Sequence, residues 1–145
     1  VHYGLETQAV YHFSSKLKLT SNLSYNRSEI LLYDKKTELV GNDIGGFPDI
    51  ILNSNIQYKL KDITLNGTLK YTGKQYTSNV NDVFVDPYLN IDVGMYYKAY
   101  GVLPGLRLNF YINNLTNDLH ATYGSFDSFF MNVPRNYNLD ISYRF

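Results

Sequence analysis

The sequence predicts an all-β protein, an antiparallel up-and-down sheet of seven strands that forms part of a transmembrane β-barrel. Three observations predict it: alternating polar and apolar residues in seven segments, alternating short and long connections, and aromatic residues at both ends of the apolar face. The last ten residues are the clearest case, because successive side chains of a strand point to opposite faces. Their apolar face consists of Tyr137, Leu139, Ile141, Tyr143 and Phe145.

The composition limits the function before any segment is considered. The chain has 145 residues, a formal net charge of zero, 15 Tyr, 8 Phe, no Trp and no Cys. A neutral sequence without a basic patch gives no electrostatic reason to bind nucleic acid, so no such partner is expected. The lack of Cys excludes disulfides and thiolate metal sites. Tyrosine favours boundaries between apolar and wet surroundings, and its abundance indicates many of them.

Neither a transmembrane helix nor a secretion signal is predicted. The sequence has no run of about 18 apolar residues and no basic segment followed by an apolar stretch. It opens at Val1, without Met and inside a predicted strand. We therefore expect a processed or partial chain.

Four segments in the first half of the chain have the period of a β-strand. They are predicted at about 4–13, 16–26, 50–60 and 63–74. The apolar face of the second segment has one exception, Ser21. Gly45, Gly46 and Pro48 mark the stretch before the third strand as a loop.

Three more strands are predicted in the second half, at about 88–98, 106–114 and 136–145. In the middle one, Leu106, Leu108 and Phe110 alternate with polar or amphipathic residues. No segment of comparable length has a convincing helical period. Strands of about 9–11 residues match the length that a tilted membrane strand needs.

The connections alternate in length. The short ones are 14–15, 61–62 and 99–105, and the long ones are 27–48, 75–87 and 115–135. In outer-membrane barrels the short turns lie in the periplasm and the longer loops outside the cell. The alternation therefore predicts which end of the sheet faces outward.

Aromatic residues of the apolar face gather near its two ends. Those expected at the short-turn end are Tyr11, Phe13, Tyr58, Tyr97, Tyr143 and Phe145, and those at the long-loop end are Tyr25, Tyr71 and Tyr137. Two aromatic girdles around an aliphatic band are typical of membrane barrels. The alternative is a soluble β-sandwich or ligand-binding barrel, whose alternation has the opposite sense. A charged content of 18%, below the usual quarter, favours the membrane interpretation.

Seven strands do not close a barrel of this kind by themselves. Bacterial single-chain barrels have an even number of strands, because both chain ends return to the periplasm. An open sheet would also expose two strand edges to hydrocarbon. The remaining strands are therefore expected from another chain or from a removed N-terminal part.

Several short motifs occur in a fixed order along the chain. They are Gly4-Leu5-Glu6-Thr7-Gln8-Ala9, Asn22-Leu23-Ser24-Tyr25, Tyr71-Thr72-Gly73, the segment Leu106 to Asn117, and Pro134-Arg135-Asn136-Tyr137 with the terminal Phe145. This set resembles the C-terminal third of a TonB-dependent outer-membrane receptor. The resemblance covers all 145 residues, loosely in the loops and well in the last 40. Thr116-Asn117 departs from the Phe-Asp that is common there.

The resemblance implies a barrel of about 22 strands with a plugged lumen, of which this chain, residues 1–145, supplies the C-terminal strands. It also implies the outer membrane of a Gram-negative bacterium and TonB-energised uptake of a scarce ligand. A ferric siderophore is the first expectation, with haem, cobalamin or an oligosaccharide as others. The implied partners are the rest of the barrel and the plug, TonB through the absent N-terminal part, membrane lipid, the barrel-insertion machinery and a small-molecule ligand.

No catalytic residue, metal site or cofactor is expected. His2, His12 and His120 are too scattered for a ligand set, and no paired carboxylates or His-x-x-x-His spacing indicates catalysis. His120 lies in a long loop near Tyr123, and both residue types bind haem iron in other proteins. A solvated or structural histidine is the ordinary alternative.

Aromatic residues in the long loops are the candidate ligand contacts, because aromatic walls with a few polar groups suit a bulky chelate. The candidates are Tyr33, Phe47, Tyr76, Phe84, His120, Tyr123, Phe126, Phe129 and Arg135. Packing of the loops against one another is the alternative for the aromatics, and anchoring of a loop to the rim is the alternative for Arg135. By resemblance, the apolar face of the terminal strand is also the signal that the insertion machinery recognises.

Two other functions remain open at this point. The first is a barrel that does not transport, such as an adhesin or a secretion pore, whose long loops bind a protein or a glycan. The second is a soluble β-barrel that binds a small ligand. Dependence on detergent would separate the soluble alternative from both membrane hypotheses.

Overall fold

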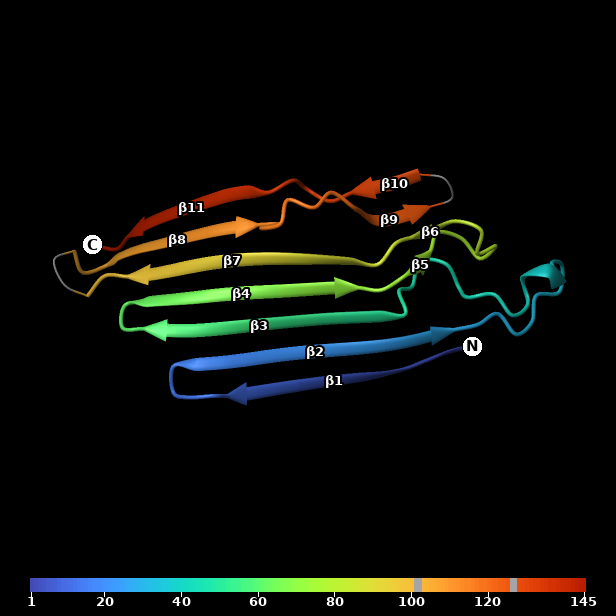
Figure 1. Cartoon of the computed structure of the whole chain (residues 1–145), viewed down its shortest axis with the longest axis horizontal. Coiled ribbons are helices and arrows are strands. Elements are labelled where there is room, and N and C mark those ends of the chain that lie inside the picture. The colour runs from blue at the N-terminus through green and yellow to red at the C-terminus, as the bar shows by residue number, and fades with distance from the viewer. Residues whose placement is uncertain (101–102, 126–127) are drawn as a thin grey trace.

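The computed structural model describes residues 1–100, 103–125 and 128–145, and its main feature is one seven-stranded antiparallel sheet (Figure 1). The strands lie in the order β1-β2-β3-β4-β7-β8-β11, each beside its neighbour in the sheet. Their bounds are β1 His2–His12, β2 Leu17–Ser28, β3 Ile50–Leu60, β4 Ile63–Thr72, β7 Tyr88–Lys98, β8 Leu106–Asn113 and β11 Asn136–Tyr143. All seven predicted strands are confirmed, with ends that shift by two residues at most.

The register of the sheet pairs apolar residues with apolar residues on one face. Leu65 of β4 lies opposite Met95 of β7, which in turn lies opposite Phe110 of β8. Ser21, the polar exception on this face, lies opposite another polar residue, Ser54. Their Oγ atoms are 2.8 Å apart and form a hydrogen bond. A register shift of one residue would move every apolar side chain to the other face. The alternation therefore specifies the pairing.

The sheet is a single layer without a conventional core. Its accessible surface is 9955 Å², whereas a compact monomer of this mass exposes about 7,600 Å². Large apolar side chains along the strands stay exposed, such as Leu5, Leu139 and Ile141 at 61–65%. The buried apolar residues that the described part of the chain contains are Ile30, Leu39, Val85 and Ala99.

The short turns lie at one end of the sheet, as the sequence predicts (Figure 1). In the first, the Oγ of Ser14 accepts hydrogen bonds from the backbone N–H groups of Lys16 and Leu17, at 3.2 and 3.1 Å. In the second, Lys61 has a φ of 49°. In the third, Gly105 has a φ of 98°, which favours glycine.

The long connections contain regular structure that the sequence analysis did not predict. The 3₁₀ helix η1 spans Thr37–Leu39, and β5 (Gln75–Tyr76) pairs with β6 (Phe84–Val85). In the last connection, β9 (Ala121–Ser125) and β10 (Ser128–Met131) form a hairpin. Within the described ranges, the chain has no helix long and apolar enough to cross a membrane.

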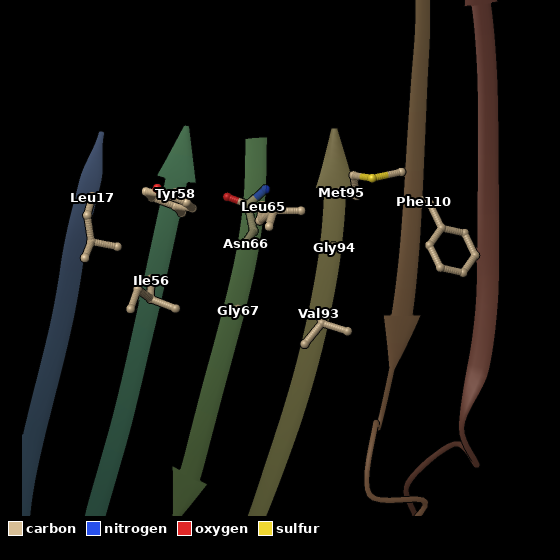
Figure 2. Close-up of a pocket in the computed structure, with 10 residues that line it drawn as sticks. All are labelled: Leu17, Ile56, Tyr58, Leu65, Asn66, Gly67, Val93, Gly94, Met95 and Phe110. Atoms are coloured by element: carbon tan, nitrogen blue, oxygen red, sulfur yellow. The ribbon is translucent and has the colours of Figure 1, made fainter. Parts of the chain in front are cut away.

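A shallow groove of about 410 Å³ lies on the apolar face (Figure 2). Its floor is Gly67, which has Ile56 of β3 on one side and Val93 of β7 on the other. A Cβ at Gly67 would approach Cγ2 of Ile56 to 3.1 Å, so the neighbour already leans over the glycine. The groove therefore results from a missing side chain within the apolar surface.

Candidate functional site

The first two long connections are joined by asparagine side chains at one end of the sheet. Asn42 donates from Nδ2 to the carbonyl groups of Asn79 and Val80, at 2.9 and 3.1 Å. Asn81 donates from Nδ2 to the carbonyl of Asp43 at 2.9 Å, and its Oδ1 accepts the N–H of Asp43 at 2.7 Å. These contacts satisfy loop backbone groups across 37 or 38 residues of sequence. The two loops therefore form one structure.

A cation and two aromatic rings meet where the second connection leaves the sheet. The rings of Tyr76 and Phe84 are 6.2 Å apart in an edge-to-face arrangement. The Nζ of Lys74 lies 4.3 Å from the centre of the Tyr76 ring and 4.0 Å from that of Phe84. Such cation–π contacts stabilise a partly exposed cation. Two of the predicted ligand contacts, Tyr76 and Phe84, are therefore neighbours.

The β9–β10 hairpin rests on the second connection. A Cβ at Gly124 would lie 2.6 Å from Cγ2 of Thr77, so this close approach requires glycine. Gln75, only 6% exposed, donates from Nε2 to the carbonyl of Thr122 at 3.4 Å. All three long connections are thereby linked into one rim.

A polar pocket of about 470 Å³ opens on the polar face below this hairpin. Lys70 and Asp92 form an ion pair in it, at 3.2 Å. Asp92 also accepts hydrogen bonds through Oδ1 from Asn90 Nδ2 and from the N–H of Asn114, both at 2.9 Å. The charges of the ion pair offset each other, and neutral amide and hydroxyl groups make up most of the remaining wall. That wall includes Asn53, Thr72, Asn113, Thr122, Asn132 and Asn136.

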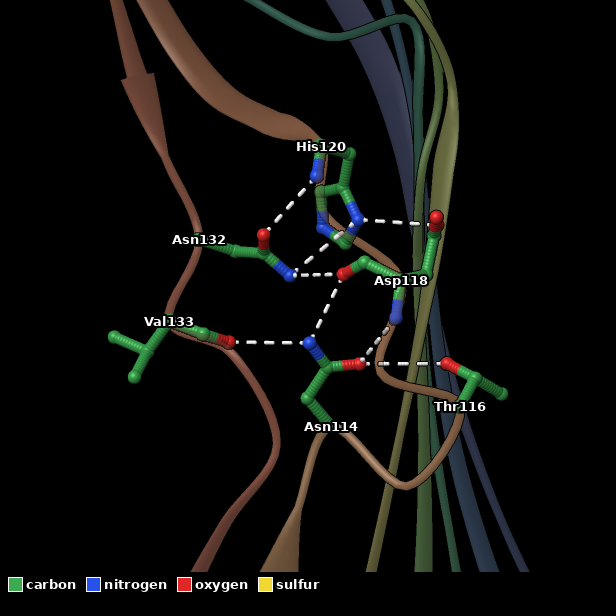
Figure 3. Close-up of polar contacts among 6 residues, drawn as sticks. All are labelled: Asn114, Thr116, Asp118, His120, Asn132 and Val133. Carbon is green, nitrogen blue, oxygen red and sulfur yellow. Dashed lines mark hydrogen bonds and ion pairs between the residues drawn. The ribbon is translucent and has the colours of Figure 1, made fainter.

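Asn114 holds the two stems of the last connection together (Figure 3). Its Nδ2 donates to the carbonyl groups of Asp118 and Val133, at 2.9 and 3.1 Å. Its Oδ1 accepts the N–H of Asp118 at 3.2 Å and the hydroxyl of Thr116 at 3.3 Å. The residue is 3% exposed and has a φ of 51°, a conformation that asparagine adopts more readily than most residues. It therefore fixes the base of the hairpin.

His120 is held from three sides above Asn114 (Figure 3). Its ring stacks on Tyr88 at 4.3 Å with an interplanar angle of 17°. The ring Nδ1 lies 3.2 Å from Oδ2 of Asp118, and the backbone N–H of His120 donates to Oδ1 of Asn132 at 3.0 Å. The side chain is 13% exposed. Within the described ranges, no three His, Cys, Asp or Glu side chains gather as a metal site would require.

A second pocket, of about 440 Å³, lies between the β5–β6 ladder and the β9–β10 hairpin. It brings together three predicted ligand contacts, Phe84, His120 and Phe129. Leu119 and Met131 add apolar wall. His120 lines both this pocket and the polar pocket, and it therefore separates an aromatic compartment from an amide-rich one.

The other predicted aromatic contacts lie elsewhere on the rim. Tyr33 is 45% exposed on the first connection. Phe47 packs on His2 at 5.4 Å, near the β1 edge of the sheet. Tyr123 packs on Phe130 across the hairpin at 5.9 Å. Phe126 lies outside the described residues.

Arg135 is exposed and bound to the backbone of its own connection. Its side-chain Nη1 donates to the carbonyl of Leu115 at 3.4 Å, and its backbone N–H donates to Oδ1 of Asn117 at 2.9 Å. These contacts fit the anchoring alternative. The residues of the predicted insertion signal are exposed; four lie on the apolar face of β11 at the edge of the sheet, and Phe145 follows that strand.

Sequence reasoning missed Tyr88, Asn114, Asp118 and Asn132. Tyr88 begins a strand, and nothing in the sequence places it under a histidine 32 residues away. The polar run from Asn113 to Asp118 held a usable signal, because asparagine is enriched at positive φ and both Asn114 and Asn117 adopt it. That signal predicts a tight turn, although it does not predict the contacts.

Comparison with known proteins identifies the sheet. A sequence model described as TonB dependent receptor-like, beta-barrel matches residues 1–115. The chain belongs to this family. No match is found among curated protein sequences.

Solved structures of TonB-dependent receptors share the fold. The siderophore receptor PiuA from Acinetobacter baumannii matches with a TM-score of 0.86 and 20% identity over 98% of this chain and 21% of that chain. The ferric citrate transporter FecA, in its unliganded form, matches at 0.87 and 20% over 99% and 24%. The ferripyoverdine receptor of the outer membrane of Pseudomonas aeruginosa matches at 0.73 and 17% over 98% and 19%. The chain thus spans about a fifth to a quarter of these structures, and identities this low establish the fold alone.

Family membership gives the two faces of the sheet their directions. In outer-membrane barrels the apolar band faces lipid, the interior is polar, and the longer loops are extracellular. In a TonB-dependent receptor barrel the polar pocket therefore opens on the lumen side, at the extracellular end. The apolar groove at Gly67 faces lipid.

Proposed function

We propose that the chain forms the last seven strands of a TonB-dependent transporter in the outer membrane of a Gram-negative bacterium. The barrel would have about 22 strands around a plug, and its cargo would be a scarce ligand, foremost a ferric siderophore. Family membership and the iron-related receptors among the structural matches support this proposal. TonB would act through the part of the protein that precedes this chain.

One observation carries the proposal: the three long connections form a hydrogen-bonded rim over two adjoining pockets. A rim held by Asn42, Asn81 and Asn114 is ordered before a ligand arrives. A preordered site loses less conformational entropy on binding than a mobile one. The arrangement therefore suits a receptor for a dilute ligand.

The two pockets offer complementary chemistry to an iron chelate. The aromatic compartment, with Phe84 and Phe129, can pack on the apolar parts of a chelate. The amide-rich compartment can donate hydrogen bonds to its oxygen atoms. His120 stands at their junction, so a ligand spanning both compartments would pass over its edge.

Binding of ferric siderophores to the full-length receptor tests the proposal. Replacing both Phe84 and Phe129 by Ala should weaken binding of the transported chelate at least tenfold, about 1.4 kcal/mol, and lower uptake of labelled iron. Phe13→Ala is the matched control, because Phe13 packs on Tyr11 at the short-turn end of the sheet, away from both pockets. Equal affinity in the double variant and the control would contradict this assignment of the ligand site.

A panel of chelates first identifies which cargo the receptor takes up. Cells that depend on this receptor for iron should grow on at least one siderophore and should lose that growth when TonB is deleted. Growth or uptake that does not depend on TonB, for every chelate offered, would contradict a transporter of this class.

A further inference from the structure

The charges of this chain sum to zero, but they are unevenly distributed. The three long connections, 29–49, 73–87 and 114–135, contain nine Asp or Glu and four Lys or Arg, a net charge of −5. The strands and short turns carry the balancing positive charge. A field of one sign raises the local concentration of ions of the opposite sign. The extracellular end of this sheet therefore attracts cations and repels anions.

In the amide-rich compartment the fixed charges cancel. Lys70 and Asp92 line it and lie 3.2 Å apart. His120 lines it too, and it is charged only when protonated. If Lys70 turned to a negatively charged ligand, Asp92 would lose its cation, although the Asp92 side chain is only 17% exposed. Such an exchange is costly, because a carboxylate shielded from water needs a partner.

The aromatic compartment has carboxylates without a fixed cation. Asp86 and Asp118 line it beside the rings of Phe84 and Phe129, and no Lys or Arg is among the described residues of its wall. Asp86 is exposed and takes part in none of the ion pairs that the described residues form. Asp118 is 59% exposed, with His120 as its neighbour (Figure 3). The compartment is therefore negative as well as aromatic.

The cations nearest to the two compartments already have partners. The Nζ of Lys74 lies 4.0 Å from the centre of the Phe84 ring and donates to the hydroxyl of Tyr76 at 3.1 Å. Arg135 donates to a carbonyl of its own connection. Arg27 lies 3.8 Å from Asp43. None of these three cations lines either compartment.

We propose that the cargo of this receptor is a ferric chelate with a net positive charge, whose cationic group enters the aromatic compartment. Carboxylates and aromatic faces both attract a cation, and both meet there. Hydroxamate groups can balance the charge of Fe³⁺, so a hydroxamate chelate with a free amine is cationic. Catecholate and citrate complexes of Fe³⁺ keep a negative charge, which this site repels. The inference rests on the proposed function and narrows its ligand class.

Uptake of one chelate in three charge states tests the inference. Ferrioxamine B is a hydroxamate chelate whose free amine is protonated at neutral pH. Acetylation of the amine makes the chelate neutral and succinylation makes it anionic, while the iron centre stays the same. Cells that depend on the full-length receptor for iron should take up the cationic form at least tenfold faster than the neutral form, and the anionic form most slowly.

The same assay includes ferric citrate and a ferric tris-catecholate, and its outcomes separate the two proposals. Equal uptake of the three charge states, or a cargo found only among neutral or anionic chelates, would overturn the positive charge and leave a TonB-dependent transporter standing. Uptake of every chelate without TonB would contradict the proposed function, and this inference with it.

Removal of two carboxylates tests the aromatic compartment itself. Asp86→Asn together with Asp118→Asn should weaken binding of the cationic chelate to the full-length receptor at least tenfold and change binding of its acetylated form little. The matched control is Asp34→Asn with Glu38→Gln, which removes the same charge from the first connection, outside both compartments. Equal losses of affinity in the two double variants would overturn the compartment as the site of the cation.

Salt provides a readout that needs no variant. The Debye length falls from about 30 Å at 0.01 M to about 3 Å at 1 M ionic strength. Binding of the cationic chelate to the unmodified receptor should weaken across this range, and binding of the acetylated chelate should not. An affinity for the cationic chelate that is independent of salt would overturn the inference.

Discussion

At the scale of single residues, asparagine side chains determine the structure of the extracellular end. Asn42, Asn81 and Asn114 each bond backbone groups of distant segments, and two of them adopt positive φ. An asparagine amide both donates and accepts, so one side chain can satisfy a carbonyl and an N–H together. Loops that would otherwise be solvated become fixed, and the aromatic residues proposed to contact ligand acquire defined positions.

Asn114→Ala should loosen the last connection. The change removes both donors to the carbonyl groups of Asp118 and Val133 and places a residue less suited to positive φ at a φ of 51°. The Asp118 carbonyl keeps the Nδ2 of Asn132 at 2.8 Å, so the Val133 carbonyl is the group that loses its side-chain donor. Leaving a polar group away from water unpaired costs about 1–3 kcal/mol. Hydrogen exchange should show lost protection in β9 and β10, whereas Thr116→Ala, which removes a single exposed partner of Asn114, should change little. Equal protection in both variants would contradict the role given to Asn114.

At the scale of elements, the strands were predictable and the hairpin was not. Strands such as β3 and β7 must separate lipid from lumen along 11 residues, and that requirement leaves a long alternating pattern. β9 and β10 have five and four residues, and much of their apolar surface is exposed, so no alternation marks them.

Part of the candidate site was predictable for a related reason. Residue type and loop position were enough to select Phe84, His120 and Phe129, which line one pocket. Tyr88 and Asn132 contact His120, although they lie 32 and 12 residues from it in the sequence. The fold brings them together, so the sequence alone did not predict these contacts.

The assignment of faces can be tested on one strand. Phe110 lies on the apolar face between Met95 and Leu139, and its neighbour Asn109 lies on the polar face between Tyr96 and Asp140. Phe110→Arg should destabilise the full-length receptor in a bilayer by about 2–4 kcal/mol, because arginine would enter hydrocarbon. Asn109→Arg should be tolerated, since it faces the lumen near Asp140. Equilibrium unfolding in lipid vesicles measures both, and the reverse order of stabilities would mean that the faces are exchanged.

At the scale of the whole molecule, the sheet depends on surroundings that the chain does not supply. β1 and β11 each pair on one side only, so two edges carry unpaired backbone groups. An open edge in hydrocarbon is not tolerated, because its N–H and C=O groups have no partner there. Lipid and further strands thus satisfy two different surfaces of one layer.

The isolated chain should therefore not remain monomeric in plain buffer. Its apolar face exposes Leu5, Leu139 and Ile141 at 61–65%, and exposed edges pair readily with other chains. Analytical ultracentrifugation should show large aggregates without detergent, and circular dichroism should show strand content in soluble particles once micelles cover the apolar face. Adding salt should not dissolve the aggregates, because apolar contacts and edge pairing hold them. A monodisperse monomer that unfolds cooperatively in plain buffer would show that this face is covered by the chain itself, which contradicts a lipid-facing surface.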